Sequence, residues 1–436
     1  MKKYFAFLSL LSFGISAMAQ TTPTTLSLEQ AVSYALQQNT TLQNKKLDVE
    51  YAKGQVLETA SIGLPQINGK IDFNNNLILP VFVFPNPATG RNEPIRVGQN
   101  FSTTAGISVS QLLFDGTYFL GLKAANQFVE MATQLENLSV AQVKNTVVKS
   151  YYLALIAAEN LKLIKANYEV INKTYEQTSA MYKAGFAEKL DADRLFIAKS
   201  NLETQIKSVE NQVEITLKML KLNIGMDVNT PLTLSDNLEK LYTASDDLSG
   251  SESDIYKYRP EYKVLNKQQE LNHLNLKRYK VSMIPSLSAF YNYQTATYSN
   301  ELKFDPWFNS SLWGMSLRVP IFSGLNTKAQ LDKVGVDILK TENELSNFKQ
   351  MAGLEVYQAK SKYLLNMESL TLQKQNMNLA QEILNTTSKK YENGLGSNLE
   401  VMTAQQDLKT AQTNYLNAIY DVLVAKADLL KALGKN

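Results

Sequence analysis

The feature that most constrains this chain is a long stretch almost without helix-breaking residues. Between Gly121 and Gly225 there is no proline, and Gly185 is the only glycine. Because glycine and proline most often end a helix, the stretch predicts one helix over about 117–183. At ~1.5 Å per residue this helix is on the order of 100 Å long. We expect the chain to reverse at Gly185 and to return as a second helix that ends at Gly225.

The return helix has a narrow apolar face. Its apolar residues follow one another at intervals of three and four, as in a coiled coil: Ile206, Val209, Val213, Leu217, Leu220 and Ile224. The other faces are rich in Gln, Asn, Lys and Glu. Such a helix has neighbours along its sides and water elsewhere. The pattern therefore indicates a wall of helices rather than a compact core.

A tandem repeat covers most of the chain. A shift of 209 residues aligns positions at both turns and at both helix ends without a gap, namely Tyr182, Gly185, Leu190 and Gly225 with Tyr391, Gly394, Leu399 and Gly434. Each half reads as a helix, two extended runs and two more helices. We therefore divide the mature chain into a first repeat (20–225), an inter-repeat linker (226–258) and a second repeat (259–436).

The extended runs alternate between apolar and polar residues, which predicts strands with one apolar and one polar face. The runs lie at 67–79, 101–110, 287–297 and 313–321. A soluble antiparallel sheet with one wet face would show the same pattern. Membrane strands are favoured by charges on the polar face and by a cluster of aromatic residues: Tyr291, Tyr293, Tyr298, Trp307 and Trp313.

Four strands are too few to close a barrel, for which about eight is the smallest number. We therefore expect several chains to share one barrel, and three chains give a trimeric 12-stranded barrel. The expected fold class is mainly α with a membrane β-barrel part, in which tandem-repeat long α-helical hairpins form a tunnel. The segments 80–100 and 299–309 are expected as surface loops.

The first 19 residues have the features of a signal peptide. Lys2 and Lys3 precede an apolar run that closes with Ala-Met-Ala before Gln20. We expect cleavage after Ala19 and exclude 1–19 from the fold. The alternative is a short membrane anchor, but the run is short for a bilayer span.

Composition excludes several classes of function. There is no cysteine and a single histidine, His273, so no metal site or catalytic nucleophile is expected. The glycine-rich segment 394–398 lies between helices, which indicates a turn rather than a phosphate-binding loop. The formal net charge of +3 falls to +1 without Lys2 and Lys3, so no nucleic-acid partner is expected. We therefore predict a protein that is not an enzyme and carries no cofactor.

These features together resemble the TolC-like outer-membrane efflux proteins of Gram-negative bacteria. The resemblance rests on the repeat, on Pro65 and Pro285 at the first strand of each half, and on the motifs FDG (114–116) and FSG (322–324) after the second strands. It implies an outer-membrane channel that is the exit duct of a tripartite efflux or type I secretion system. It also implies a homotrimer whose barrel lies in the outer membrane and whose tunnel lies in the periplasm.

The same resemblance implies partners. They are outer-membrane lipids, a periplasmic adaptor (membrane fusion) protein, and an inner-membrane pump or ABC transporter. Residues 228–258, together with the terminal segments, would form a belt around the tunnel. Drugs, metal ions, peptides and secreted proteins all pass through ducts of this family. The alternative function is a periplasmic coiled-coil adaptor or scaffold, which has only one long helical hairpin.

The resemblance also assigns the residues at the two helical turns. The turns at the periplasmic tips, where an adaptor docks in the family, fall on Gly185, Phe186, Gly394 and Leu395.

Three further residues are candidates for a gate. Tyr391 falls on the gating tyrosine of the family, and Asp191 on the acid that holds the closed gate. Glu400 supplies one carboxylate per chain, so three copies would form an acidic ring. The family prototype's tip arginine falls on Gly396, and a second acid falls on Thr403. In the alternative, purely structural interpretation, the tyrosine packs across its hairpin and both acids stabilise helix N-termini through the macrodipole.

Overall fold

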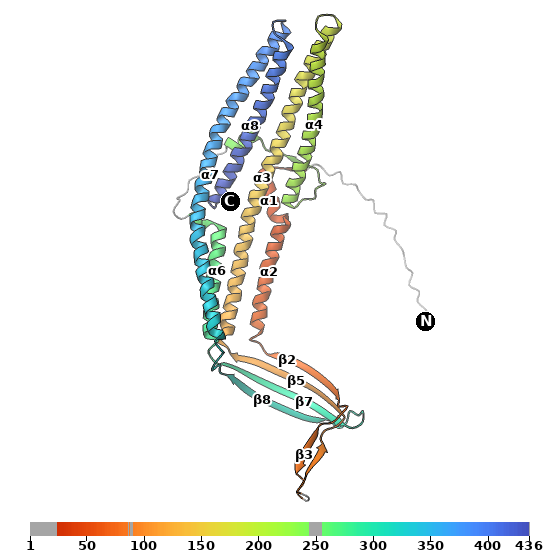
Figure 1. Cartoon of the computed structure of the whole chain (residues 1–436), viewed down its shortest axis with the longest axis vertical. Helices are drawn as coiled ribbons and strands as arrows, with labels where there is room; N and C mark the ends of the chain where they lie inside the picture. Colours follow the sequence, from red (N-terminus) through yellow and green to blue (C-terminus); the bar gives the residue numbers. More distant parts are fainter. Residues whose placement is uncertain (1–23, 86, 88–89, 244–254, 436) are drawn as a thin grey trace, which may run out of the picture.

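The molecule is elongated, with a β-sheet at one end and the turns of two helical hairpins at the other (Figure 1). The computed structural model describes residues 24–85, 87, 90–243 and 255–435. The expected signal peptide (1–19) lies outside the described residues, and so does part of the expected linker, 244–254.

Two long helices, α3 (Gly116–Lys183) and α7 (Asn326–Glu392), run from the sheet to the tips. Their 68 and 67 residues correspond to ~100 Å each. The predicted helix over 117–183 is thereby confirmed. None of the helices in the described ranges is both long and apolar enough to cross a bilayer.

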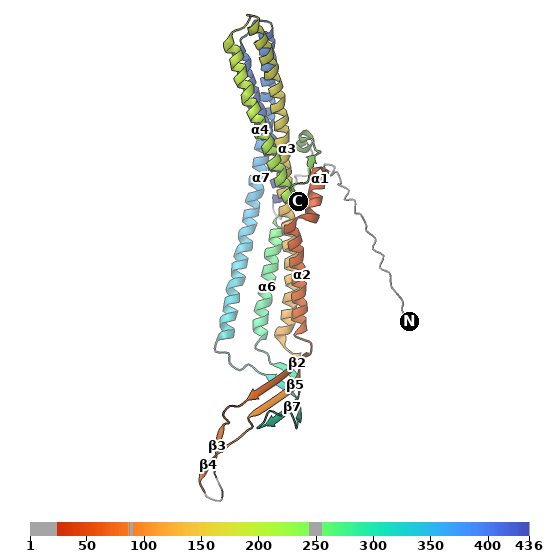
Figure 2. The ribbon, with the colours of Figure 1, turned by 90° about the vertical axis from the view of Figure 1, so that its right-hand side faces the viewer.

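Shorter helices flank the two long ones (Figure 2). In the half nearer the sheet, α2 (Thr40–Ser61) packs on α3, and α6 (Pro260–Val281) packs between α3 and α7. In the half nearer the tips, α4 (Lys189–Ile224) packs on α3, and α8 (Asn398–Ala432) packs on α7 and also on α3. The upper half is therefore a layer in the order α4, α3, α8, α7.

The sheet contains the four predicted strands. These are β2 (Gln66–Asn75), β5 (Phe101–Phe114), β7 (Ser286–Ser299) and β8 (Phe308–Arg318), antiparallel in that order. The pairing of β5 with β7 joins the two halves of the chain.

The predicted alternation gives the sheet two different faces. One cross-strand row on the apolar face is Ile67, Val109, Tyr291 and Trp313. The opposite face is a shallow polar hollow lined by residues that include Asn68, Lys70, Asp72, Thr104, Ser108, Asn292, Gln294 and Ser310. Because most of the apolar side chains are exposed in one chain, this face needs a cover that the chain does not supply.

The structure differs from the sequence-based expectation at the strand ends. The strand β2 ends at Asn75, whereas the expected run extended to residue 79. The strand β8 begins at Phe308, five residues before the expected start at residue 313. The expectation of a plain loop at 80–100 was wrong, because β3 (Val81–Pro85) and β4 (Asn92–Arg96) form a separate two-stranded sheet. Proline is tolerated in this hairpin because both of its strands are edge strands.

A buried core lies at mid-length, where the start of the chain meets the segment between the repeats. The strands β1 (Thr24–Leu26) and β6 (Leu232–Leu234) pair in parallel, next to α1 (Leu28–Gln38). The short helices α5 (Leu238–Thr243) and η1 (Ile255–Tyr258) follow β6 in the chain.

Tyr151 of α3 fixes this layer to the long helix. Its ring is fully buried, and its hydroxyl donates a hydrogen bond of 3.0 Å to the carbonyl oxygen of Leu26. Burial raises the pKa of Tyr151 above its ordinary value, so the hydroxyl keeps its proton. Within this layer, a carboxylate oxygen of Asp236 accepts a hydrogen bond from the backbone N–H of Leu28 at 2.7 Å. This bond joins the start of α1 to the segment after β6.

Gly225, which ends α4 as predicted, contacts the break between α1 and α2. Its φ is +79°, and a Cβ at this position would lie 2.3 Å from the carbonyl oxygen of Gln38. At the same point the Asn39 side chain donates to the carbonyl oxygen of Asn223 at 2.7 Å. By contrast, Gly185 has a φ of +82° with nothing within 4 Å of the added Cβ.

We therefore expect Gly225→Ala to lower the thermal unfolding midpoint much more than Gly185→Ala. The Gly185 change costs only the left-handed conformation of a non-glycine residue, about 1–2 kcal/mol. The Gly225 change adds a backbone clash to the same cost. Circular dichroism melting of both variants measures the difference. Equal midpoints would contradict the packing of α4 against the α1–α2 break.

Candidate functional site

The two helical turns at the tips have the same backbone geometry. Gly185 and Gly394 have φ values of +82° and +72°. Each lies two residues after the last residue of its long helix. The N–H of Phe186 donates to the carbonyl oxygen of Met181, and that of Leu395 donates to Lys390, both at 2.8 Å. The N–H of each glycine also donates to the carbonyl oxygen three residues before it. This pair of hydrogen bonds defines the Schellman motif at a helix C-terminus.

The residues after these glycines are apolar and project from the molecule. In a Schellman motif this residue usually packs back on its own helix. Here Phe186 is 81% exposed and Leu395 is 82% exposed. Both tips therefore present a large apolar side chain to the solvent.

Tyr391 connects the second hairpin to the first. It lies in the last turn of α7, half-buried against the cluster that includes Val401 and Leu408 of α8. Its hydroxyl shares a hydrogen bond of 2.8 Å with the hydroxyl of Thr178, a fully buried residue of α3. The two hairpins come from different repeats, so this bond joins the two halves at the tip.

Asp191 takes part in a second connection between the hairpins. The side-chain N–H group of Asn398, at the start of α8, donates to the backbone oxygen of Asp191 at 3.1 Å and lies 3.5 Å from its carboxylate. Asn398 is only 2% exposed. Asp191 and Tyr391 therefore bind different partners and do not form one network.

Glu400 lies apart from these two contacts. Its side chain is exposed in the first turn of α8, and its backbone N–H donates to the Ser397 hydroxyl at 3.3 Å. An acid in this place is stabilised by the helix macrodipole.

The neighbouring Gly396, where the family prototype has an arginine, leaves little room for a side chain. A Cβ there would lie 3.2 Å from both the Cβ of Lys390 and the backbone nitrogen of Tyr391. A side chain at this position would require these neighbours to move by a few tenths of an ångström.

The sequence reasoning missed Thr178 and Asn398. Both are polar residues buried between the hairpins, and their contacts depend on the offset between the first hairpin and the second: Thr178 of α3 meets α7, and Asn398 of α8 meets α4. The sequence contains one weak signal for the role of Asn398, which is a polar residue directly after the N-cap serine of α8. From sequence alone, Asn398 would be interpreted as part of the helix cap and not as a contact between hairpins.

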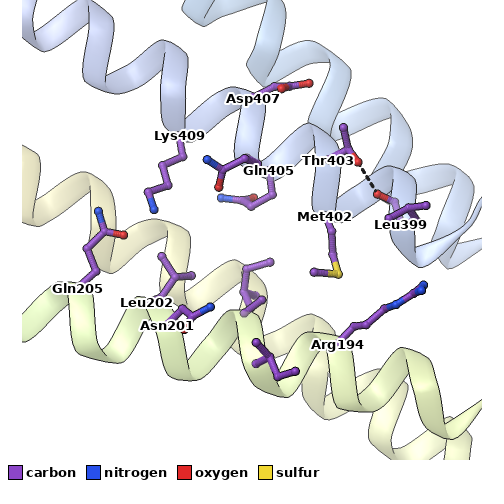
Figure 3. Close-up of a pocket in the computed structure, with 14 residues that line it drawn as sticks. Arg194, Asn201, Leu202, Gln205, Leu399, Met402, Thr403, Gln405, Asp407 and Lys409 are labelled. Carbon is purple, nitrogen blue, oxygen red and sulfur yellow. Dashed lines mark hydrogen bonds between the residues drawn. The ribbon is translucent and has the colours of Figure 1, made fainter.

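A groove of about 500 Å³ runs beside the tips between α4 and α8 (Figure 3). Met402 of α8 points towards α4, and Arg194 of α4 lies opposite it. Gln405 is only 6% exposed, and neither of its side-chain amide atoms has a hydrogen-bond partner in the part of the chain that the structure describes. Leaving a buried polar group unpaired costs about 1–3 kcal/mol.

Within the same described residues no group of three or more His, Cys, Asp or Glu side chains could hold a metal ion. The tip site therefore consists of turns, two connections between hairpins, and a groove.

A family model now decides the assignment. The model described as "Outer membrane efflux protein" matches residues 31–225 and 280–435, one segment in each half of the chain. The chain belongs to the outer membrane efflux protein family. Over 415 residues it is 23% identical to the toluene efflux pump outer membrane protein TtgF of Pseudomonas putida, covering 93% of this chain and 83% of that protein.

One further relative resembles the chain in sequence, and one solved structure resembles it in fold. The chain is 21% identical to the outer membrane protein TolC of Vibrio cholerae, covering 76% of each protein. The outer membrane channel CmeC of Campylobacter jejuni has the same fold, with a TM-score of 0.76 at 18% identity over 94% of this chain and 85% of that chain. The expected fold class is thereby confirmed.

Family membership gives the function at the level of the whole protein. This outer membrane efflux protein is an outer-membrane exit duct of a transport system, and its helices form a tunnel in the periplasm of a Gram-negative cell. The family consists of channel proteins and not of enzymes. The alternative function of a periplasmic adaptor or scaffold is therefore set aside.

The hydrogen bond between Tyr391 and Thr178 predicts an effect on channel conductance. We expect Tyr391→Phe and Thr178→Val each to raise the conductance in planar bilayers, because each removes a bond worth about 0.5–1.5 kcal/mol between the hairpins. The double variant should conduct no more than either single variant, since both changes break the same bond.

Thr387→Val is the matched control for this test. Thr387 is the repeat equivalent of Thr178, but its hydroxyl donates to Ile383 in its own helix at 2.9 Å. Its substitution should leave the conductance unchanged. Additive effects of the Tyr391 and Thr178 changes would show that the bond does not restrain the hairpins.

Proposed function

We propose that three copies of this chain share one 12-stranded barrel and one helical tunnel. The observation that carries the proposal is the four-stranded sheet with two open edges, β2 and β8, and an exposed apolar face. The four strands alternate in direction, so β8 of one copy is antiparallel to β2 of the next. Twelve strands then close without an edge and satisfy every backbone group in the membrane.

The helices support the same assembly. Along α7, Leu365, Leu372 and Leu379 recur every seventh residue and are 65%, 52% and 57% exposed in a single chain. A seven-residue apolar repeat is typical of a coiled-coil seam. Because α7 and α4 form the two sides of the helical layer, the seam of one copy would pack on α4 of the next.

We further propose that the tips bind a periplasmic adaptor, which connects the channel to an inner-membrane pump or ABC transporter. Phe186 and Leu395 supply exposed apolar anchors at the two tips. Large apolar side chains that are exposed to solvent in one place are characteristic of a binding surface.

The docking proposal predicts that Phe186→Ser combined with Leu395→Ser reduces copurification of the adaptor. Burying one large apolar side chain contributes about 1.5–3 kcal/mol, so each loss should weaken binding by roughly 10-fold or more. Leu77→Ser is the matched control, because Leu77 is 89% exposed at the opposite end of the molecule.

Light scattering should show a detergent-solubilised trimer for all variants. A folded monomer would refute the shared barrel, and an unchanged adaptor yield would refute the docking residues.

We also propose that the tips form the gate, with Asp191, Tyr391 and Glu400 at the entrance. The exposed carboxylate of Glu400 occurs once per chain, so three copies would gather negative charge at a narrow opening. Such a ring attracts cations and repels anions. Tyr391 and Asp191 would hold the entrance narrow through their bonds with Thr178 and Asn398.

The acidic ring predicts a cation-selective channel whose selectivity depends on Glu400. We expect Glu400→Gln to move the reversal potential across a KCl gradient towards zero. The effect should be largest at low salt, since the Debye length falls from ~10 Å at 0.1 M to ~3 Å at 1 M. Glu188→Gln removes an exposed acid at the start of α4 and serves as the control with little effect. If Glu400→Gln leaves the potential unchanged at low salt, Glu400 acts only at its helix start.

A further inference from the structure

The β3–β4 hairpin carries an aromatic face that the described residues leave about half exposed. Phe82, Phe84 and Ile95 lie on the same side of the hairpin and are 52%, 48% and 49% exposed. The two phenylalanine rings lie 6.3 Å apart. The hairpin is not part of the main sheet and extends away from it in both views (Figures 1 and 2). Because an isolated two-stranded hairpin is barely stable in water, this face needs a partner.

A second exposed apolar group lies in the turn between β7 and β8. It contains Leu302, Phe304 and Trp307, which are 64%, 54% and 40% exposed. The register places both groups at the same end of the sheet, since Asn75 at the end of β2 pairs with Phe101, which in turn pairs with Ser299 at the end of β7.

The strand order places two copies of the β7–β8 turn near each hairpin, one from the same chain and one from the neighbour. Within one chain, β2 and β8 lie on opposite edges, three strand spacings or ~14 Å apart. In the proposed barrel, β2 of one copy lies beside β8 of its neighbour, only one spacing or ~5 Å away. The hairpin that follows β2 therefore starts next to the neighbour's β7–β8 turn. It returns into β5 beside the chain's own β7, where the backbone N–H of Asn100 donates to the Asn300 side chain at 3.2 Å. The chain's own turn nevertheless leaves Phe82 and Phe84 about half exposed, so the turn still available to cover the aromatic face is the neighbour's.

The charges of the two segments are complementary. The hairpin contains Arg91 and Arg96 with one acid, Glu93. The β7–β8 turn contains the acids Glu301 and Asp305 with one base, Lys303, so a net positive segment faces a net negative one. Opposite charges at the rim of an apolar contact favour its orientation.

We propose that the aromatic face of the β3–β4 hairpin docks on the β7–β8 turn of the neighbouring copy. Three such contacts form a collar at the mouth of the barrel, outside the membrane strands, and join each seam a second time. This inference rests on the proposed trimer, and its test separates the failure of the collar from the failure of the trimer.

The absence of cysteine from the chain makes cross-linking a direct test. Differently tagged Phe84→Cys and Phe304→Cys chains are co-expressed, purified as trimers and oxidised mildly. We expect a disulfide-linked pair that contains both tags, and a covalent trimer when both changes are in one chain. Val83→Cys with Phe304→Cys is the matched control. Val83 is 61% exposed in the same strand but points to the opposite face, so it should cross-link several-fold less.

Each other outcome overturns the collar. If trimers form by light scattering but Phe84→Cys and Phe304→Cys do not cross-link, the hairpin contacts lipid, solvent or another protein instead. If Phe84→Cys alone cross-links, the hairpins meet each other around the barrel axis. If no trimer forms, the proposed function fails before the collar is reached.

Tryptophan fluorescence gives an independent readout, because the chain has only two tryptophans. In a Trp313→Phe background, Trp307 is the single reporter of the turn. Substituting Phe82→Ser and Phe84→Ser in the trimer should shift its emission to longer wavelength, whereas Val83→Ser should not. If the emission wavelength of Trp307 is unchanged by Phe82→Ser and Phe84→Ser, the proposal is overturned.

Discussion

A helix of ~100 Å cannot be buried by one chain of this size. The long helices α3 and α7 are covered thoroughly only at mid-length, where α1, β1 and β6 add a second layer around Tyr151. Away from that core, apolar residues such as Leu339 and Leu379 remain exposed. The same holds for the apolar face of the sheet. In the proposed trimer, the free energy that a globular domain gains within one chain would come from contacts between copies along the helices and from lipid against the apolar face of the sheet.

The tandem repeat uses one kind of turn for two purposes. Four glycines end their helices with the same hydrogen-bond pattern, and they are Gly185, Gly225, Gly394 and Gly434. Two of them are packed against other segments, Gly225 on Gln38 and Gly434 on Tyr258. The other two meet no atom within 4 Å and form the free tips. The duplicated sequence thus gives equivalent backbone turns, and the surroundings decide which turns are packed inside the chain and which stay exposed at the tips.

The parts of the fold set by local chemistry could be predicted from sequence. The limits of α3 follow from the absence of helix breakers before Gly185, and the two faces of the sheet follow from alternation. The β3–β4 hairpin was missed because its prolines resemble those of a loop. The contacts of Thr178 and Asn398 were missed for a different reason. They depend on the offset along the helix axes between the first hairpin (α3, α4) and the second (α7, α8), and that offset is fixed by packing over the whole layer.

The mid-length core also determines how the entrance can move. The ion pair between Lys149 and Asp428, at 2.5 Å, and the buried ring of Tyr151 hold the helices together at this level. From there α4 extends 36 residues, or ~54 Å, to its tip. At its tip α4 is joined to α8 by the hydrogen bond from Asn398 to Asp191, and once this bond breaks the helix would act as a lever fixed at the core. A rotation of roughly 5° at the core would displace the tip by ~5 Å, about half the diameter of a helix. In the proposed gate, a wide change of aperture would therefore need one broken bond at the tip and only small adjustments in side-chain packing far from the opening itself.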